Sequence, residues 1–263
     1  MPIRSRAPLT YLIPLLLACT ALFALTAYLL GGSPTARGKR PPDTEAAGTV
    51  GGSADAAPPI ACVVIDAGHG GEDGGASSAA GVLEKELNLS VSLALRDLFE
   101  AAGIPVVMTR TEDILLYDRN VNFQGRKKAL DLAARRLVAE KTAAEVAENG
   151  GGTCLFISIH MNAFPQPQYS GMQVWYGAGH PLSAEVAESI QVASAAIMPE
   201  NHRRIKEAGS NIYLLDRIQT PAVLVECGFL SNPAEAERLS KEAYRYAVAS
   251  VIFGAIAPYT DQC

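Results

Sequence analysis

The sequence predicts an α/β domain built on a mostly parallel, twisted sheet flanked by helices. Two observations predict this class. From Ile60 onward, short runs rich in β-branched residues alternate with long helical patterns, as in chains whose parallel strands are joined by crossover helices. The run CLFISI, at residues 154–159, is apolar on both of its faces, which is expected of a central strand covered by helices on two sides.

The expected strands are the short apolar runs, and the expected helices are the longer segments with an apolar period near that of a helix. In chain order, strands are expected at Ala61–Asp66, Ile104–Thr109, Cys154–His160, Met172–Tyr176, Ile212–Leu215 and Ala222–Glu226. Helices are expected at Glu86–Ala102, Arg126–Glu148, Leu182–Met198 and Pro233–Ala257. No internal repeat interrupts this alternation.

Composition and charge describe an ordinary globular protein. Of the 263 residues, 49% are apolar and 19% are charged, and the net charge is −5. The chain lacks the basic surplus of nucleic-acid-binding proteins, so no nucleic acid is expected as a partner. Residues 60–263 are long enough for one domain with its own core. Cys62, Cys154 and Cys227 stand in apolar runs away from metal-ligand spacing and are expected to be buried.

The first 32 residues form a separate hydrophobic segment. Residues 9–30 carry no charge and follow Arg4 and Arg6, and they are long enough to cross a bilayer. The length favours an uncleaved membrane anchor with an extracytoplasmic domain; a cleaved signal and a secreted protein are the alternative. Residues 33–59 lack an apolar period and are expected to be a flexible linker.

Four residues with reactive side chains stand beside the expected strands and helices. His69 follows the first strand, His160 and Glu226 end two later strands, and Glu84 precedes the first helix. Ligands of open parallel sheets bind at the carboxyl ends of strands, where three of these residues fall. Two imidazoles and one carboxylate can hold Zn²⁺ and leave a fourth position open, as in catalytic zinc sites. The second carboxylate would then be free to act as a base.

Each of these residues also has an ordinary explanation when taken alone. The glycines around His69 can form a loop without catalytic purpose, and His160 can be a hydrogen-bonded core residue. Glu84 can be a carboxylate favoured at a helix start, where Glu86 competes for the same role. Glu226 is different, because a carboxylate after the apolar run AVLV is buried and needs a cation, a proton or a metal site nearby.

The segments IDAGHGGEDGGA, LEKELNL, SIHMNA and PAVLVECGFLSNPAEAERL together resemble the zinc-dependent N-acetylmuramoyl-L-alanine amidases of the type 3 family. This family cleaves peptidoglycan between the lactyl group of muramic acid and L-alanine. The resemblance covers residues 60–258 and implies that His69, Glu84 and His160 bind the zinc and that Glu226 is catalytic. It selects Glu84 over Glu86, because the motif places the ligand at the glutamate before Lys85.

The length, the N-terminal apolar segment and the stretch GRKKALDLAARR are similar to the germination-specific subgroup of that family. This similarity implies a role in spore-cortex maturation, on the way to muramic δ-lactam. Peptidoglycan is the expected substrate, and no motif identifies a protein activator. The alternatives are a zinc peptidase or deacetylase on a related scaffold, and a peptidoglycan-binding module without catalysis.

The implied reaction needs an activated water and a proton carrier. Bound zinc lowers the pKa of water and polarises the carbonyl, while Glu226 takes the water proton and passes it to the leaving amine. Arg203 and Lys206 stand in a basic run before an expected strand and are candidates for binding stem-peptide carboxylates. The alternative for this run is a solvated turn.

Overall fold

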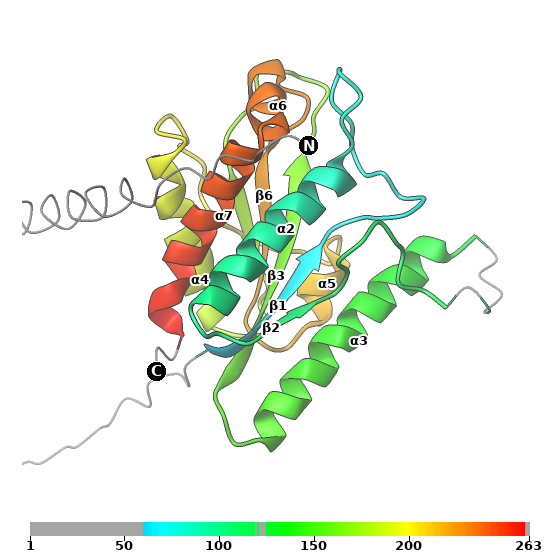
Figure 1. The fold of residues 1–263 in the computed structure, drawn as a ribbon, viewed down its shortest axis with the longest axis vertical. Helices are drawn as coiled ribbons and strands as arrows, with labels where there is room; N and C mark the ends of the chain where they lie inside the picture. Colours follow the sequence, from blue (N-terminus) through cyan, green and yellow to red (C-terminus); the bar gives the residue numbers. More distant parts are fainter. Residues whose placement is uncertain (1–59, 119, 121–124, 261–263) are drawn as a thin grey trace, which may run out of the picture. The chain divides into compact units, whose positions relative to one another are not determined.

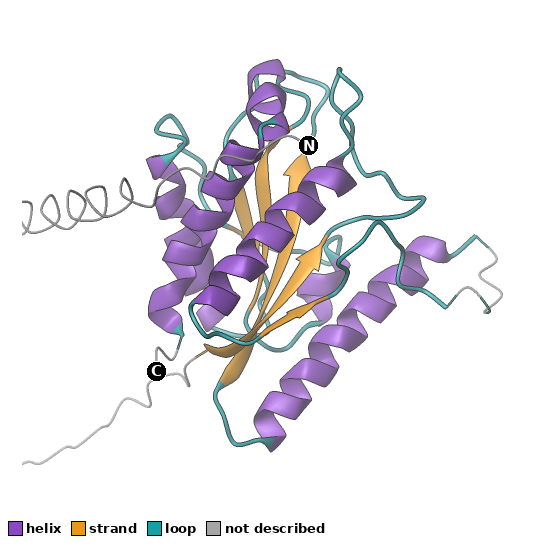
Figure 2. Cartoon of the chain, in the orientation of Figure 1, coloured by secondary structure: helices purple, strands orange, loops and turns teal. Residues whose placement is uncertain are grey.

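A computed structural model describes residues 60–118, 120 and 125–260. Its centre is a six-stranded sheet with the strand order β2-β1-β3-β6-β4-β5. Figure 2 shows the strands in orange with purple helices around them. Strands β2, β1, β3 and β6 run parallel to one another, whereas β4 pairs antiparallel with β6 and parallel with β5. The strands are β1 (Ile60–Ala67), β2 (Val106–Met108), β3 (Thr153–Asn162), β4 (Gln173–Tyr176), β5 (Lys206–Glu207) and β6 (Ala222–Phe229). The predicted mostly parallel α/β fold is confirmed.

Helices cover both faces of the sheet. Helices α2 (Glu84–Ala101), α4 (Leu182–Ala193) and α7 (Glu242–Ile256) pack together on one face, where Figure 1 shows α2 and α7 in front of the strands. Helices α3 (Lys127–Glu148) and α5 (Tyr213–Arg217) lie on the other face, and α6 (Pro233–Ser240) follows β6. We call the second face the α3 face.

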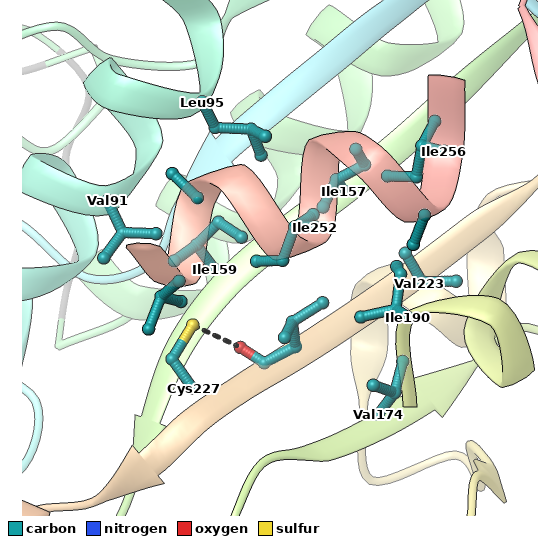
Figure 3. Close-up of a cluster of buried hydrophobic side chains, with 14 of the residues drawn as sticks. Val91, Leu95, Ile157, Ile159, Val174, Ile190, Val223, Cys227, Ile252 and Ile256 are labelled. Carbon is teal, nitrogen blue, oxygen red and sulfur yellow. Dashed lines mark hydrogen bonds between the residues drawn. The ribbon is translucent and has the colours of Figure 1, made fainter. Parts of the chain in front are cut away.

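Alternating side chains of the strands feed two separate apolar cores. On the first face, Ile157 and Ile159 of β3 pack with Leu95 of α2 and Ile252 of α7 (Figure 3). On the α3 face, Phe156, which precedes Ile157 and points the opposite way, packs in a smaller cluster. Both faces of the central strands are therefore buried, which explains the continuous apolar runs in the sequence. The expected burial of Cys62, Cys154 and Cys227 is confirmed.

One predicted strand is wrong. Residues Ile212–Leu215 were expected to be extended, but Tyr213–Arg217 form the short helix α5. The strand that was not expected is β5, Lys206–Glu207. Leu214 and Leu215 are buried in the smaller core on the α3 face. A short apolar run satisfies such burial as helix or strand, so its period does not discriminate between the two.

Two predicted helices are shorter or divided. The segment 233–257 breaks at Lys241, whose backbone is extended with φ −87° and ψ 125° between α6 and α7. Arg245 of α7 donates hydrogen bonds to the carbonyls of Leu239 and Ser240, which satisfies the end of α6. Helix α4 ends at Ala193 and continues as a single 3₁₀ turn, Ser194–Ala196.

The N-terminal expectations lie outside the described residues. Both the anchor or signal at 1–32 and the linker at 33–59 belong to this part of the chain. Within the described ranges, none of the helices combines the length and the apolar character that crossing a membrane requires.

Candidate metal centre

Strand alternation brings four polar side chains to one face of the sheet. In β1 and β3, every second residue faces α3, so Asp66, Ser158 and His160 continue the rows begun by Val64 and Phe156. In β6, Glu226 continues the row of Ala222 and Leu224 in the same way. His160 and Glu226 are direct register partners on the neighbouring strands β3 and β6. The carboxyl ends of three parallel strands therefore converge on the α3 face.

His69, Glu84 and His160 form a compact group of potential metal ligands. One ligand atom from each residue lies within 4.8 Å of the others. Nε2 of His69 lies 3.2 Å from Oε1 of Glu84, and Nδ1 of His160 lies 2.9 Å from the same oxygen. The three residues come from the loop after β1, the first turn of α2 and the end of β3.

Two glycines make this close approach possible. A Cβ atom on Gly68 would collide with the imidazole of His160, and one on Gly75 would collide with the side chains of Glu84 and His69. Gly75 also has φ +66°, which an L side chain rarely adopts. The glycine-rich loop therefore has a steric reason at these positions, beyond general flexibility.

Glu84 is fixed by the backbone on both sides of the site. Its Oε2 accepts a hydrogen bond of 2.8 Å from the amide of Ala76, while its own amide donates to the carbonyl of Ala76. Its Oε1 accepts from Asn88 Nδ2 and from the amide of Met161. Burial alone would raise the pKa of Glu84, but hydrogen bonds and charge from His160 and His69 hold that pKa far below its usual range. The carboxylate is therefore charged at neutral pH.

His69 has a strained backbone that two buried arginines hold in place. Its φ is +61°, in the left-handed region that residues other than glycine seldom occupy. Nη2 of Arg135 donates to the carbonyl of His69 at 2.7 Å, and Nη1 donates to that of Ala67. Arg110 donates to the carbonyls of Ala67 and Gly68. All three consecutive carbonyls before and at the candidate ligand are thereby bound to guanidinium groups.

Arg135 is itself part of a buried charge network. Its guanidinium contacts Asp66 and Asp131, each at 2.7 Å, and its side chain is 2% exposed. Asp66 also accepts hydrogen bonds from Thr109 and Ser158. Burial would raise the pKa of Asp66, but Arg135 and the two hydroxyl donors lower it below its ordinary value. The network joins α3 to β1, to β3 and to Thr109, the residue after β2.

The second nitrogen of His69 faces a further carboxylate. Nδ1 lies 2.9 Å from Oδ2 of Asp73, an ion-pair contact that leaves Nε2 directed at Glu84. Burial favours the neutral imidazole, but the two carboxylates together raise the pKa of His69 above its ordinary value. An outer carboxylate of this kind orients metal-binding histidines in many proteins.

Glu226 stands beside the three-residue group without belonging to it. Its Oε2 is buried and has no hydrogen-bond partner among the described residues. Burial raises the pKa of Glu226 to about 7, with the nearby histidines lowering it and Glu84 raising it further. An unpaired buried carboxyl is costly, so this atom indicates that the site is built for a further proton or ligand.

The donor set fits a zinc ion. Zinc ligands at about 2.0–2.2 Å in tetrahedral geometry lie roughly 3.3 Å apart, close to the separations of the two imidazole nitrogens from Glu84 Oε1. A cavity of about 90 Å³ is lined by His69 and His160, together with Asp66 and Arg135. This exceeds the roughly 10–15 Å³ that one water requires. Two histidines and one carboxylate leave the fourth position of a tetrahedral zinc open, as in catalytic zinc sites. The cavity adjoins the two histidines on the α3 face, and neither Glu84 nor Glu226 is among its lining residues.

The other predicted residues lie elsewhere. Glu86 is exposed on α2, away from the two histidines. Arg203 stacks 4.5 Å above the ring of Phe229, and Lys206 lies 5.1 Å above the ring of Trp175. Lys206 belongs to the edge strand β5, and β4 and β6 lie between this strand and β3, which carries His160.

Sequence reasoning missed the residues that support the candidate ligands. These are Asp66, Asn88, Arg110, Asp131 and Arg135, each 5% exposed or less. For Asp66 a signal existed, because an aspartate that ends a fully apolar strand must be paired. For Arg135 none existed, because Arg136 beside it has the same side chain, yet is 36% exposed and pairs with Glu140 at 3.7 Å.

Comparison with known proteins decides the family. The family profile for N-acetylmuramoyl-L-alanine amidase matches residues 63–258. This chain belongs to that family. It is therefore an enzyme, an N-acetylmuramoyl-L-alanine amidase, and its substrate is peptidoglycan.

Relatives in sequence and structure agree with this amidase assignment. The germination-specific N-acetylmuramoyl-L-alanine amidase of Bacillus subtilis (strain 168) is 36% identical over 197 residues, which are 75% of this chain and 78% of that protein. The CwlD amidase of Clostridioides difficile, solved in complex with the GerS lipoprotein, is 36% identical with a TM-score of 0.65 and covers 75% and 97% of the two chains. An N-acetylmuramoyl-L-alanine amidase of Clostridium difficile 630 is 28% identical with a TM-score of 0.62, covering 76% and 96%.

Proposed function

We propose that this amidase is zinc-dependent and that His69, Glu84 and His160 bind the ion. The observation that carries the proposal is the convergence of three ligand atoms within 4.8 Å, beside a buried and unpaired carboxylate oxygen of Glu226. When bound at such a site, zinc supplies Lewis acidity to the amide carbonyl and to the attacking water.

Glu226 is the proposed base. Its pKa, raised to about 7, suits a group that both accepts and donates a proton near neutral pH. Oε2 of Glu226 takes the proton of the attacking water and delivers it to the nitrogen of the leaving L-alanine. Asp73 orients the imidazole of His69, and the backbone amides of Ala76 and Met161 orient the carboxylate of Glu84. Arg203 and Lys206 remain candidates for contacts with the stem peptide.

Paired substitutions separate metal binding from proton transfer. His69→Ala, Glu84→Ala and His160→Ala each remove a candidate ligand, so zinc content and amidase activity fall together. Glu86→Ala is the matched control, because its side chain is exposed on the same helix turn as Glu84, and it keeps both properties. Glu226→Gln keeps the shape and the zinc but loses about 10²–10⁴ in rate. The measurements are metal content of the purified variants and release of L-alanine-terminated peptides from muropeptides.

Specific outcomes contradict these roles. A Glu226→Gln protein with near-normal turnover assigns the base to another residue, and full zinc content in His69→Ala removes that residue from the ligand set. Products cleaved within the stem peptide indicate a peptidase, and release of acetate indicates a deacetylase. Binding of muropeptides without any cleavage indicates a non-catalytic module.

The biological setting is a finer proposal. Similarity to the germination-specific amidase of Bacillus subtilis supports action on the spore cortex, in the formation of muramic δ-lactam. Deletion of the gene in the native host leaves vegetative growth unchanged and removes muramic δ-lactam from spore peptidoglycan. A host that forms no spores, or spores with unchanged δ-lactam, moves the enzyme to general wall remodelling.

The location is also a proposal. Peptidoglycan lies outside the cytoplasmic membrane, and residues 9–30 are an uncharged run of bilayer length. The amidase domain is therefore placed on the outer side of the membrane, held by residues 1–32 through the linker at 33–59. Secretion after signal cleavage is the alternative.

A further inference from the structure

Two exposed aromatic rings form a small platform at the carboxyl edge of the sheet. Phe164 is 46% exposed and Tyr169 is 42% exposed, and their ring centroids lie 5.2 Å apart. Both pack on the fully buried ring of Phe229, which stacks at 5.6 Å from Phe164 and 6.3 Å from Tyr169. We call these three residues the aromatic platform.

The platform is held in place by hydrogen bonds to the chain around it. The amide of Phe164 donates to Oγ of Ser231 at 3.0 Å, and Nδ2 of Asn232 donates to the carbonyl of Tyr169. Arg203 lies over the ring of Phe229, and its Nε donates to the carbonyl of Ser170 at 2.7 Å. The exposed rings are therefore oriented before any ligand arrives, which reduces the entropy lost on binding.

Two short stretches of chain link the platform to the candidate metal centre. Phe164 follows His160 by four residues, and Phe229 follows Glu226 by three. The Cα atoms of each pair therefore lie within about 14 Å of one another. A third connection runs across the sheet: Gln173 is the register partner of Glu226, and its side-chain amide donates to the carbonyl of Arg204, next to Arg203.

We propose that the aromatic platform is a subsite for the glycan strand of peptidoglycan, which holds a sugar beyond the disaccharide that carries the cleaved bond. The faces of aromatic rings are electron-rich and attract the C–H groups that cover one face of a pyranose ring. A protein partner is the less favoured occupant, because a stable protein interface buries about 800 Å² on each side and two rings supply only a small part of it. The inference rests on the proposed amidase function and extends it to substrate length.

The test compares a short and a long substrate in matched variants. The double variant Phe164→Ala, Tyr169→Ala is measured with soluble, uncross-linked glycan strands carrying stem peptides and with a single disaccharide-peptide. For the strands, KM rises about tenfold while kcat is unchanged, because ring stacking contributes to binding and not to the chemistry. For the disaccharide-peptide both constants stay near those of the wild type. Tyr246→Ala, which removes a 53% exposed ring from α7, is the control, and it leaves KM and kcat unchanged for both substrates.

Each contrary result has a separate meaning. An unchanged KM for the glycan strands overturns the proposal that the platform is a glycan subsite. A protein partner is then the remaining candidate to contact the two rings. Equal losses on both substrates also overturn it, because they indicate damage to the site itself. If the wild type cleaves neither substrate, the proposed function fails instead; binding of peptide-free glycan strands to the wild type and the double variant, measured by calorimetry, then still tests the platform.

Discussion

At the scale of single residues, the site depends on carboxylates held in opposite states by their surroundings. Glu84 accepts several hydrogen bonds and has a strongly lowered pKa, whereas Glu226 has a buried oxygen without a partner and a raised pKa. The two residues face the same pair of histidines. Neighbouring carboxyl groups with pKa values shifted apart are typical of catalytic sites, where one is a fixed charge and the other exchanges a proton.

The raised pKa of Glu226 predicts a pH effect on the stability of the metal-free protein. Its ordinary pKa is 4.5 and its folded value is about 7, so between these values the folded state binds more protons than the unfolded state. The free energy of unfolding therefore decreases as pH rises through this window. The contribution is at most about 3.5 kcal/mol, at about 1.4 kcal/mol per unit of pKa difference.

Urea unfolding of chelator-treated wild type and Glu226→Gln at pH 5 and pH 7.5 measures this effect. Glutamine does not titrate, so the wild type loses stability relative to the variant at the higher pH. Glu84 stays charged in the folded state at both pH values, and His69, whose pKa is raised, is present in both proteins, so their contributions largely cancel in the comparison. Parallel pH profiles for the two proteins would show that Glu226 is solvated and that its pKa is ordinary.

At the scale of secondary-structure elements, α3 supports the site through one buried side chain. Arg135 connects this helix to Asp66 of β1 and to the carbonyl of His69, and Asp131 of the same helix accepts from Arg135 and from the amide of Leu116. The loop that contains His69, whose backbone is in the left-handed region, is thus fixed by a helix that supplies none of the candidate ligands. Buried charges are strongly coupled, so loss of one partner leaves the others without compensation.

Arg135→Met is expected to destabilise the fold and the metal centre together. The free energy of unfolding falls by about 3–5 kcal/mol, because Asp66 and Asp131 are left as buried, unpaired charges. Zinc affinity falls as well, because the carbonyl of His69 loses its donor. Arg136→Met is the matched control: it lies beside Arg135, is 36% exposed, and is expected to change stability by no more than about 0.5 kcal/mol.

Denaturant unfolding and zinc competition with a chromogenic chelator measure both effects. Arg135→Lys keeps the charge but not the planar fork, so it is expected to fall between Arg135→Met and the wild type in both measurements. Wild-type zinc affinity in a folded Arg135→Met protein would contradict the positioning role and leave Arg135 with a purely structural one.

At the scale of the whole molecule, the apolar cores and the candidate site occupy different parts of the sheet. The two apolar cores are formed by residues along the length of the strands. The candidate ligands, Glu226 and the aromatic platform lie instead at the edge of the sheet where β1, β3 and β6 end. This is the usual position of ligand sites in open α/β sheets, because parallel strands release their loops at one common edge. The proposed tether at residues 1–32 would place that edge near its wall substrate.

Protease accessibility tests the proposed location. Protease added to intact protoplasts is expected to digest the amidase domain, while a cytoplasmic marker protein stays intact. An anchored protein is recovered in the membrane fraction, and a cleaved and secreted one is recovered in the medium with a shortened N-terminus. Full protection of the domain in intact protoplasts would reverse the topology.

The sequence by itself determined the class of the fold and the edge of the sheet at which the candidate site lies. Apolar runs and helical periods report burial directly, because a strand covered on both faces must be apolar throughout, as in residues 154–159. His69, His160 and Glu226 could be located because they follow such runs, and the ends of parallel strands meet in space. These inferences need only local patterns and one rule of topology.

Only the tertiary structure decided which side chains face one another. Glu84 and Glu86 are two residues apart on one helix, so they point in nearly opposite directions, and the packing of α2 against β3 places Glu84 beside the histidines and Glu86 in solvent. The same holds for Arg135 and Arg136 on α3, and for the run at 212–215, which is buried as a helix and not as a strand. In each case the local sequence allows both outcomes, and the choice depends on contacts with residues distant along the chain.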